Sequence, residues 1–144
     1  MVTVSKKREE KLAKLVREFF AVHPDVKLVA ITGSAGKASA KIAIGTVLAQ
    51  QFDIQLRNEE PKTKADVFLQ MMGVKMPEKG LFKWWKVMRA VKKRIKAEKP
   101  EVQVIVQEFN PKELGYNDWF KAYVVPDITV VTSVTNGRMQ VEYS

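Results

Sequence analysis

The sequence contains no cysteine and only one histidine, His23, among its 144 residues. The lack of cysteine excludes disulfides, thiolate catalysis and cysteine-ligated zinc sites. A single histidine, placed directly before Pro24, leaves no histidine cluster for a metal site or a catalytic triad. Any chemical role therefore rests on carboxylates, hydroxyls, amines and backbone groups.

The sequence also lacks a long hydrophobic segment. No apolar run reaches the roughly 18 residues that a membrane-spanning helix requires. The charged start of the chain does not resemble the apolar core of a secretory signal. An apolar content of 46% with 28% charged residues is ordinary for a globular protein. We therefore expect a single domain over residues 1–144 and a cytoplasmic location.

Acidic residues are scarce in one segment, which carries most of the net charge. Residues 79–99 contain nine lysines or arginines and one acid, Glu98, and so account for +8 of the formal net charge of +9. A nucleic-acid partner is disfavoured, because the positive charge is confined to this segment and no recognised nucleic-acid-binding motif is present.

Helical and strand patterns alternate along the chain. Helices are predicted at 5–22, 41–52, 81–98 and 117–124, and strands at 27–32, 53–57, 102–109, 127–134 and, after a turn at Asn136-Gly137, 139–143. Residues 58–64 are predicted as a loop, and residues 67–72 fit either a strand or a helix. The alternation predicts an α/β fold with a mostly parallel sheet flanked by helices in three layers.

A glycine-rich segment follows the predicted buried strand at 27–32. Its seven residues are Gly33, Ser34, Ala35, Gly36, Lys37, Ala38 and Ser39. Glycines allow backbone N–H groups to converge on an anion, a helix N-terminus adds positive potential, and a lysine can reach a phosphate. We therefore predict a phosphate-binding loop and helix N-terminus directly after a central parallel strand. The strict P-loop pattern has four residues between its glycines, whereas only two separate Gly33 from Gly36. The alternative is therefore a purely structural turn.

The segment KLVAITGSAGKASAKIAIGTVL resembles the P-loop region of the Mur ligases, ATP-dependent amide-forming enzymes of peptidoglycan synthesis. The likeness is greatest to their D-alanyl-D-alanine-adding members. Glu108 matches a strand-terminal glutamate that helps to bind magnesium in the family, Gly115 matches a following glycine, and PDITVVT resembles a later strand. The resemblance covers about residues 12–134. It implies a P-loop-type domain that binds ATP or ADP at residues 33–39 and magnesium at Glu108.

The differences from this family fall on its chemistry. Ala38 cannot supply the magnesium-binding hydroxyl that follows the family's lysine, and Ser39 would point about 100° away around the helix. Arg138 stands where the family usually has a histidine, and residues 58–64 replace its substrate loop. The chain matches only the ATP-binding core of such an enzyme. The resemblance therefore implies weak nucleotide binding, little contribution from magnesium, and little or no amide-ligase activity by this chain alone.

Without the resemblance, Glu108 has three interpretations: a metal ligand, a surface carboxylate or a partner for Lys37. Its position at the end of a strand favours a functional role, because ligands gather outside the carboxyl ends of strands in α/β sheets. Asp127 is expected only to set the start of its strand.

The predicted helix at 81–98 combines a basic face with an apolar stripe. The stripe consists of Leu81, Trp84, Trp85, Met88, Val91 and Ile95. The simplest interpretation is a helix packed on the sheet with solvated lysines. The alternative is an interaction module, a pseudoenzyme that uses residues 81–99 to contact an anionic membrane surface, a cell-wall synthesis protein or a nucleic acid. A binding role predicts exposed lysines beside a partly exposed Trp84 or Trp85.

Overall fold

The computed structural model describes residues 4–77, 81–110 and 124–133. Their elements follow in the order α1 (Lys6–Val22), β1 (Lys27–Thr32), α2 (Lys37–Leu48), β2 (Ile54–Leu56), α3 (Lys64–Met71), α4 (Leu81–Lys96), β3 (Val104–Glu108) and β4 (Ile128–Val131). The four strands form one sheet in the order β2-β3-β1-β4, and every pair is parallel. The predicted α/β fold is confirmed.

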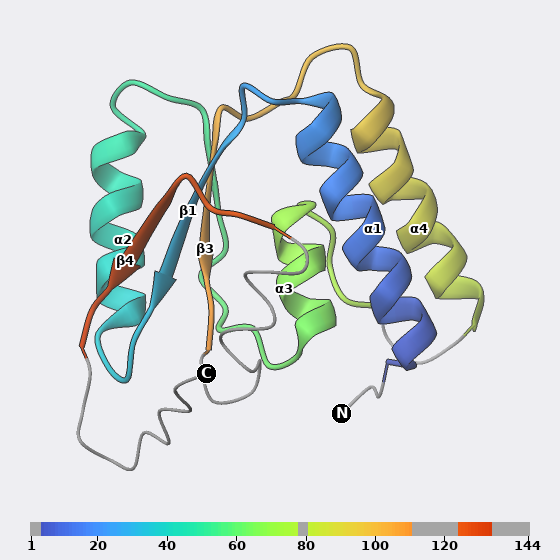
Figure 1. The fold of residues 1–144 in the computed structure, drawn as a ribbon, viewed down its shortest axis with the longest axis horizontal. Coiled ribbons are helices and arrows are strands. Elements are labelled where there is room, and N and C mark those ends of the chain that lie inside the picture. The colour runs from blue at the N-terminus through green and yellow to red at the C-terminus, as the bar shows by residue number, and fades with distance from the viewer. Residues whose placement is uncertain (1–3, 78–80, 111–123, 134–144) are drawn as a thin grey trace, which may run out of the picture.

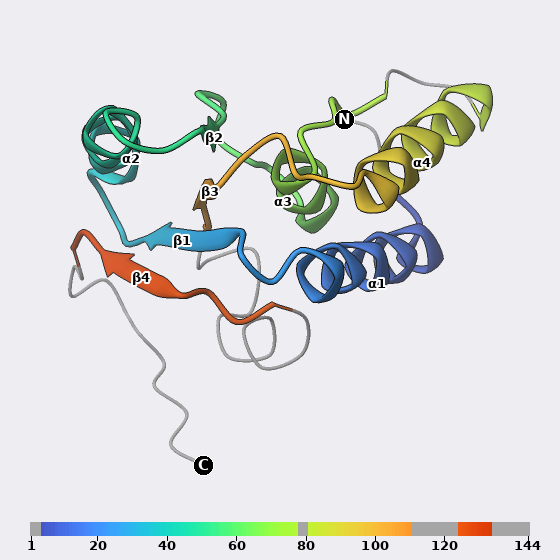
Figure 2. The same ribbon diagram turned by 90° about the horizontal axis from the view of Figure 1, so that it is seen from above.

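The helices lie on both faces of the sheet, as Figures 1 and 2 show. Helix α2 covers one face, while α1, α3 and α4 lie on the other. The small core under α2 consists of Val29, Ile31, Val104 and Val106, packed against Ala40, Ile44 and Leu48. The larger core on the other face includes Leu12, Phe19, Phe68, Val91 and Ile105. Neighbouring residues of β1 and β3 enter different cores because side chains alternate along a strand.

Four of the predicted strands lie in the described residues: β1 has the predicted bounds, and β2, β3 and β4 are shorter than predicted. Five of the six residues of β1 are buried, and all of β3 is buried. Their apolar, largely β-branched sequences are typical of parallel strands that are covered on both faces. Asp127 precedes β4, and its Oδ2 accepts a hydrogen bond of 2.8 Å from the backbone N–H of Leu28. This bond ties the start of β4 to the start of β1.

The predicted bounds of α2 require correction, and the ambiguous segment is resolved. Helix α2 begins at Lys37 rather than at residue 41 and ends at Leu48 rather than at residue 52. The ambiguous segment at 67–72 belongs to helix α3, which begins within the predicted loop. A capping box of Thr63 and Asp66 starts α3: the Thr63 hydroxyl accepts from the Asp66 N–H, and the Asp66 carboxylate accepts from the Thr63 N–H. Helix α1 follows Ser5 at its N-cap, but the Ser5 side chain makes no capping hydrogen bond.

The only histidine has a structural position. His23 follows α1, is buried, and its Nε2 lies 3.0 Å from the carbonyl oxygen of Ile95 in α4. This contact joins the carboxyl ends of two helices that lie side by side (Figure 1).

Some predictions fall outside the described residues. The predicted helix at 117–124 does so except for its last residue, Val124. The turn at Asn136-Gly137, the strand at 139–143, Gly115 and Arg138 do so entirely. Among the described helices, none has the length and apolar content that a bilayer crossing requires.

Candidate anion-binding site

The glycine-rich segment lies at the carboxyl edge of the sheet. Strand β1 ends at Thr32, and α2 begins at Lys37. Strand β1 is an interior strand with β3 and β4 as parallel neighbours. The loop and the start of α2 therefore lie at the edge of the sheet where α/β proteins usually bind their ligands, as predicted (Figure 1).

Two glycines allow the loop to make its turn. Gly33 has a φ of 137° and Gly36 a φ of 79°, and residues other than glycine rarely adopt φ values in this range. A Cβ on Gly33 would also overlap Oγ1 of Thr132, which follows β4. Gly36 is the N-cap of α2 in the left-handed conformation. Both glycines are thus required for the backbone path, and Gly33 also for the close approach of Thr132.

Lys37 is the first residue of α2, and its side chain turns back over the loop. Its Nζ donates a hydrogen bond of 3.1 Å to the carbonyl oxygen of Gly33, and the side chain is half-buried. The ammonium group therefore lies beside the backbone that would surround a phosphate. An incoming anion can accept from the same ammonium, which has three donors.

The loop is held closed by residues that follow β4. Ser34 N–H donates to the carbonyl oxygen of Ser133 at 2.9 Å, and Ala35 N–H donates to Ser133 Oγ at 3.0 Å. The Thr132 hydroxyl donates to the carbonyl oxygen of Ala35. Two backbone donors of the predicted cradle are thus already in use. They are available to an anion only if it displaces Ser133.

The start of α2 still offers backbone donors. The first hydrogen bond inside α2 is donated by Ala40 to the Gly36 carbonyl, and the N–H groups before it have no intrahelical acceptor. In the part of the chain that the structure describes, no hydrogen bond is donated by the N–H groups of residues 36–39. Ala38 and Ser39 are exposed. The open part of the site is therefore the N-terminus of α2 together with Lys37.

Glu108, the predicted magnesium ligand, forms a buried ion pair with Lys41. Its Oε2 lies 2.9 Å from Lys41 Nζ. The side chain of Lys41 is only 2% exposed and that of Glu108 only 4%. Lys41 also donates to the carbonyl oxygen of Asn58 at 3.3 Å. Two of the earlier interpretations are wrong, because Glu108 is neither a surface carboxylate nor the partner of Lys37. Its charge is balanced inside the protein.

These residues are a poor fit for a resident magnesium ion. Magnesium in nucleotide sites is usually held by one or two carboxylates and by phosphate oxygens. Glu108 is paired with an ammonium, and Ala38 has no oxygen in its side chain. Within the described residues, no three His, Cys, Asp or Glu side chains gather around a common point.

The sequence analysis missed three contributors to this site. Lys41 lies one helical turn after Lys37 and four residues before Gly45, on the side of α2 that faces the sheet. The spacing of four residues between Lys37, Lys41 and Gly45 places them on one side of a helix, and this spacing could have indicated that Lys41 faces the sheet. Thr132 and Ser133 follow β4, and only the pairing of β4 with β1 brings them against the loop.

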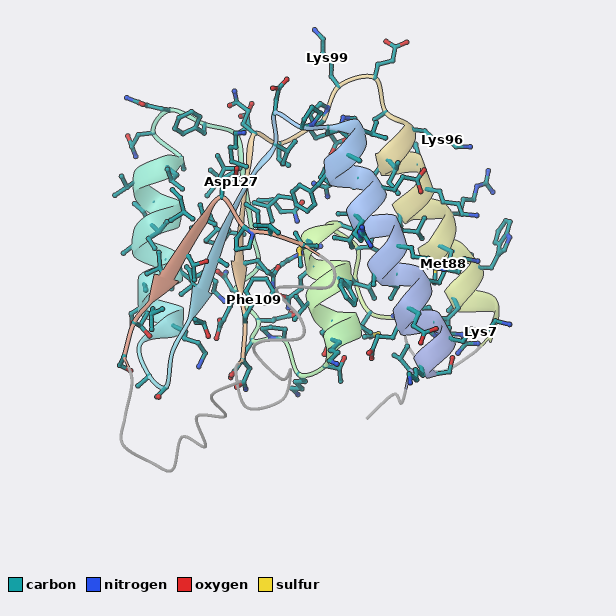
Figure 3. All side chains as sticks on the ribbon, viewed as in Figure 1. Lys7, Met88, Lys96, Lys99, Phe109 and Asp127 are labelled. Atoms are coloured by element: carbon teal, nitrogen blue, oxygen red, sulfur yellow. The ribbon has the colours of Figure 1, made fainter. Side chains whose placement is uncertain are left out.

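Helix α4 has the expected amphipathic character, but one residue that was predicted for its apolar stripe lies outside the stripe. Its buried residues are Trp84, Val87, Val91 and Ile95. Trp85 is 58% exposed, so Val87 takes the place that was predicted for Trp85. Met88 is half-buried at the border of the stripe and Lys96 is exposed; Figure 3 labels both on α4, beside α1.

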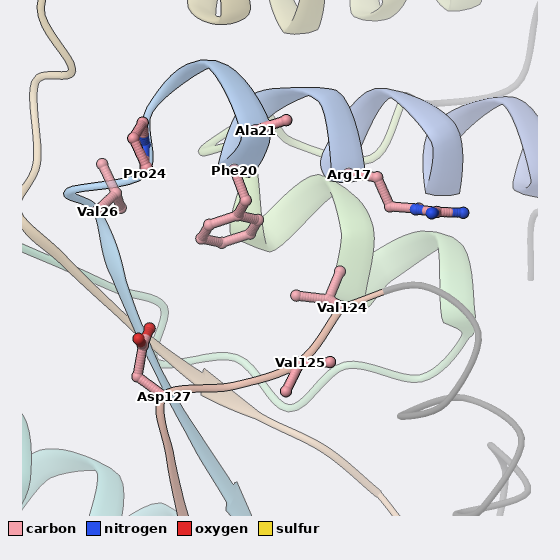
Figure 4. A pocket seen from close by; sticks show the side chains of 8 residues that line it. All are labelled: Arg17, Phe20, Ala21, Pro24, Val26, Val124, Val125 and Asp127. Atoms are coloured by element: carbon pink, nitrogen blue, oxygen red, sulfur yellow. The ribbon is translucent and has the colours of Figure 1, made fainter.

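A hollow of about 420 Å³ lies at the other end of the sheet (Figure 4). Its wall is formed by the end of α1 and by the segment that enters β4, with Phe20, Val26 and Val124 among its apolar residues. Arg17 and Asp127 are its charged residues. It lies at the amino ends of β1 and β4, so it is not part of the site at residues 33–39.

The comparisons with known proteins return no match: no family model, no curated protein and no solved structure is significantly similar to this chain. The functional argument therefore rests on the geometry and on the sequence motifs.

Proposed function

We propose that this chain is a nucleotide-binding domain of the Mur-ligase type, which binds the phosphates of ATP or ADP weakly. The observation that carries the proposal is the position of Lys37. It combines an ammonium group, turned over the loop at 3.1 Å from the Gly33 carbonyl, with the free backbone donors at the start of α2. Together they provide a cation and a set of N–H groups for a phosphate.

The affinity is expected to lie in the micromolar to millimolar range. Ser133 accepts the hydrogen bonds of the Ser34 and Ala35 N–H groups. A phosphate that uses these donors has to displace Ser133, and the free energy of breaking those bonds is subtracted from that of binding.

Magnesium is expected to add little to binding. Lys41 neutralises Glu108, so the carboxylate attracts a divalent cation less than a free one would. Ala38 supplies no coordinating oxygen. Phosphoryl transfer depends on positioning and on neutralisation of charge by metal ions and cations. We therefore propose binding with little or no amide-ligase activity by this chain alone.

A calorimetric titration with ATP and with ADP, each with and without magnesium, tests this function. We expect binding of both nucleotides and a Kd that changes less than about threefold when magnesium is removed. Lys37→Met should weaken binding about tenfold or more, because it removes a charged hydrogen-bond donor. Lys99→Met is the matched control, since Lys99 is exposed beyond α4, away from the loop (Figure 3). No binding, or nanomolar binding that requires magnesium, would contradict the proposal.

Ala38→Thr tests the role assigned to the missing hydroxyl. It should increase the effect of magnesium on the Kd, because it restores an oxygen at the position that follows the lysine. Ala43→Thr introduces the same side chain at another exposed position of α2 and should leave the magnesium effect unchanged.

A further inference from the structure

A second cationic surface lies on α1 and α4, away from the phosphate loop. These two helices run side by side along the edge of the larger core (Figures 1 and 2). An open groove of about 870 Å³ follows their exposed sides. Six cationic residues line it: Arg8, Lys11, Arg89, Lys92, Lys93 and Lys96. No acidic residue of the described chain lines this groove.

The cations surround an aromatic centre. Trp84 forms the floor and is buried, with the Arg8 guanidinium 5.2 Å from its ring centroid. Trp85 stands at the side of the groove and is 58% exposed, with the Arg89 guanidinium 5.3 Å from its ring centroid. An exposed tryptophan with a neighbouring cation suits a boundary between water and an apolar phase, because its ring is apolar while its N–H can stay wet.

This face is composite, because it is formed by two helices that are far apart in the sequence. The charge of residues 79–99 accounts for only part of it, since α1 contributes Arg8 and Lys11 to the same surface. The apolar stripe of α4 is already buried against α1 and the core. Helix α4 therefore cannot insert that stripe into a bilayer as an isolated amphipathic helix would. Contact through the cations and Trp85 remains possible without any unfolding.

We infer that this α1–α4 face docks onto an anionic lipid surface. Every charged side chain that lines the groove in the described residues is positive, and each lysine or arginine near such a membrane contributes favourably to binding. Trp85 adds one shallow anchor. A single-stranded nucleic acid fits less well, because its bases stack on open aromatic faces. Here the Trp84 ring is buried, and one face of the Trp85 ring lies under Arg89.

Co-flotation with lipid vesicles tests this inference on the whole chain. One vesicle preparation is an equimolar mixture of phosphatidylglycerol and phosphatidylcholine, and the other is phosphatidylcholine alone. We expect binding to the anionic vesicles only, with a steep loss as salt rises, because exposed charges are screened beyond about 8 Å at physiological ionic strength. Equal binding to both preparations, or binding to neither, would overturn the inference.

Two sets of variants locate the surface. Lys93→Gln/Lys96→Gln should lower the partition coefficient about 25-fold, from about fivefold for each lysine. Lys62→Gln/Lys64→Gln removes the same charge at the start of α3 and should change it far less. Trp85→Ala should weaken binding about tenfold, whereas Phe52→Ala, an exposed aromatic beyond α2, should not. Equal losses in the variants and their controls would contradict the assigned face.

A nucleic acid is the competing partner, and one comparison decides between the two. Single-stranded RNA is titrated under the same salt conditions as the vesicles. Weak RNA binding that Trp85→Ala leaves unchanged supports the lipid surface. RNA binding tighter than vesicle binding and weakened by Trp85→Ala would overturn it in favour of a nucleic acid.

Discussion

Helices α2 and α4 both carry lysines, but they place them in opposite environments. Lys41 of α2 faces the sheet and is buried against Glu108. The lysines of α4 lie in solvent, and the buried side of α4 is formed by Trp84, Val87, Val91 and Ile95. The difference shows that the side of the helix a lysine occupies, and not its residue type, decides whether it is buried in an ion pair or exposed to solvent.

The physical reason lies in what each helix covers. Helix α2 begins at the carboxyl edge of the sheet, where β3 ends in a carboxylate, so a cation on its inner side has a partner. A buried charge without a partner is strongly unfavourable. Helix α4 packs on α1 in a core of apolar side chains, and its lysines are exposed. Arg94, the partly buried cation among its described residues, has a partner inside: its Nη1 donates a hydrogen bond of 2.7 Å to the carbonyl oxygen of Met72. Four predictions follow from this difference, from the largest expected effect to the smallest.

The largest effect is expected at the two adjacent tryptophans of α4. Trp84→Ala should lower the free energy of unfolding by about 3–5 kcal/mol, because it leaves a cavity in the larger core. Trp85→Ala should change it by about 0.5 kcal/mol or less, because Trp85 is largely exposed. Urea denaturation of both variants measures the difference. Similar losses would contradict the assignment of inner and outer sides to α4.

Removal of the buried ammonium should be nearly as costly. Lys41→Met leaves Glu108 buried without its partner, and we expect a loss of about 3 kcal/mol in the free energy of unfolding. The double variant Lys41→Met/Glu108→Gln removes both charges and should recover a large part of the lost free energy of unfolding. A loss below about 1 kcal/mol for the single variant would place this pair with ordinary surface ion pairs.

The loop that starts α2 should show an intermediate effect. Gly33→Ala combines a positive φ with an overlap of its Cβ and Thr132, and we expect a loss of about 2–3 kcal/mol. Gly36→Ala meets only the conformational penalty, of about 1 kcal/mol, because its Cβ would lie 3.8 Å from the nearest atom, Thr132 Cβ. Thermal unfolding of the two variants ranks them. The reverse order would show that β4 does not lie against the loop.

The smallest effect is expected for the exposed lysines. Lys92 and Lys96 are one helical turn apart on α4 and carry like charges. Lys92→Gln should therefore raise the free energy of unfolding by about 0.3 kcal/mol at low salt and by less at high salt. Lys62→Gln, outside α4, serves as the control. A clear loss of stability in Lys92→Gln would mean that this lysine has a structural role.

Much of the fold was predictable because local patterns agreed with one another. Apolar runs of β-branched residues gave the buried strands β1 and β3, and the glycine-rich segment marked the junction of β1 and α2. The bounds of α2 were less accurate, because its inner side carries Lys37 and Lys41 where a periodic helix would carry apolar residues. Helix α3 was ambiguous for a different reason: its short sequence is apolar enough for a strand, and the capping box of Thr63 and Asp66 was overlooked.

The candidate site was only half predictable. The sequence located Lys37 and Glu108 at the same edge of the sheet, but it did not show that Lys41 would pair with Glu108 or that Ser133 would occupy loop donors. These contacts join residues 67 and 98 positions apart in the chain. No local pattern specifies such distances, since they depend on which strands become neighbours.

Local patterns along the sequence specify the alternation of strands and helices, the glycine-rich turn and the concentration of positive charge in residues 79–99. Periodicity and backbone freedom are local properties, so they can be read along the chain. The partner of each charge depends on the folded chain. The order β2-β3-β1-β4 brings the residues that follow β4 against the glycine-rich loop, and the packing of α1 on α4 joins Arg8 and Lys11 to the basic face. Coulomb energy depends on distance and burial, and both are fixed only when the chain is folded.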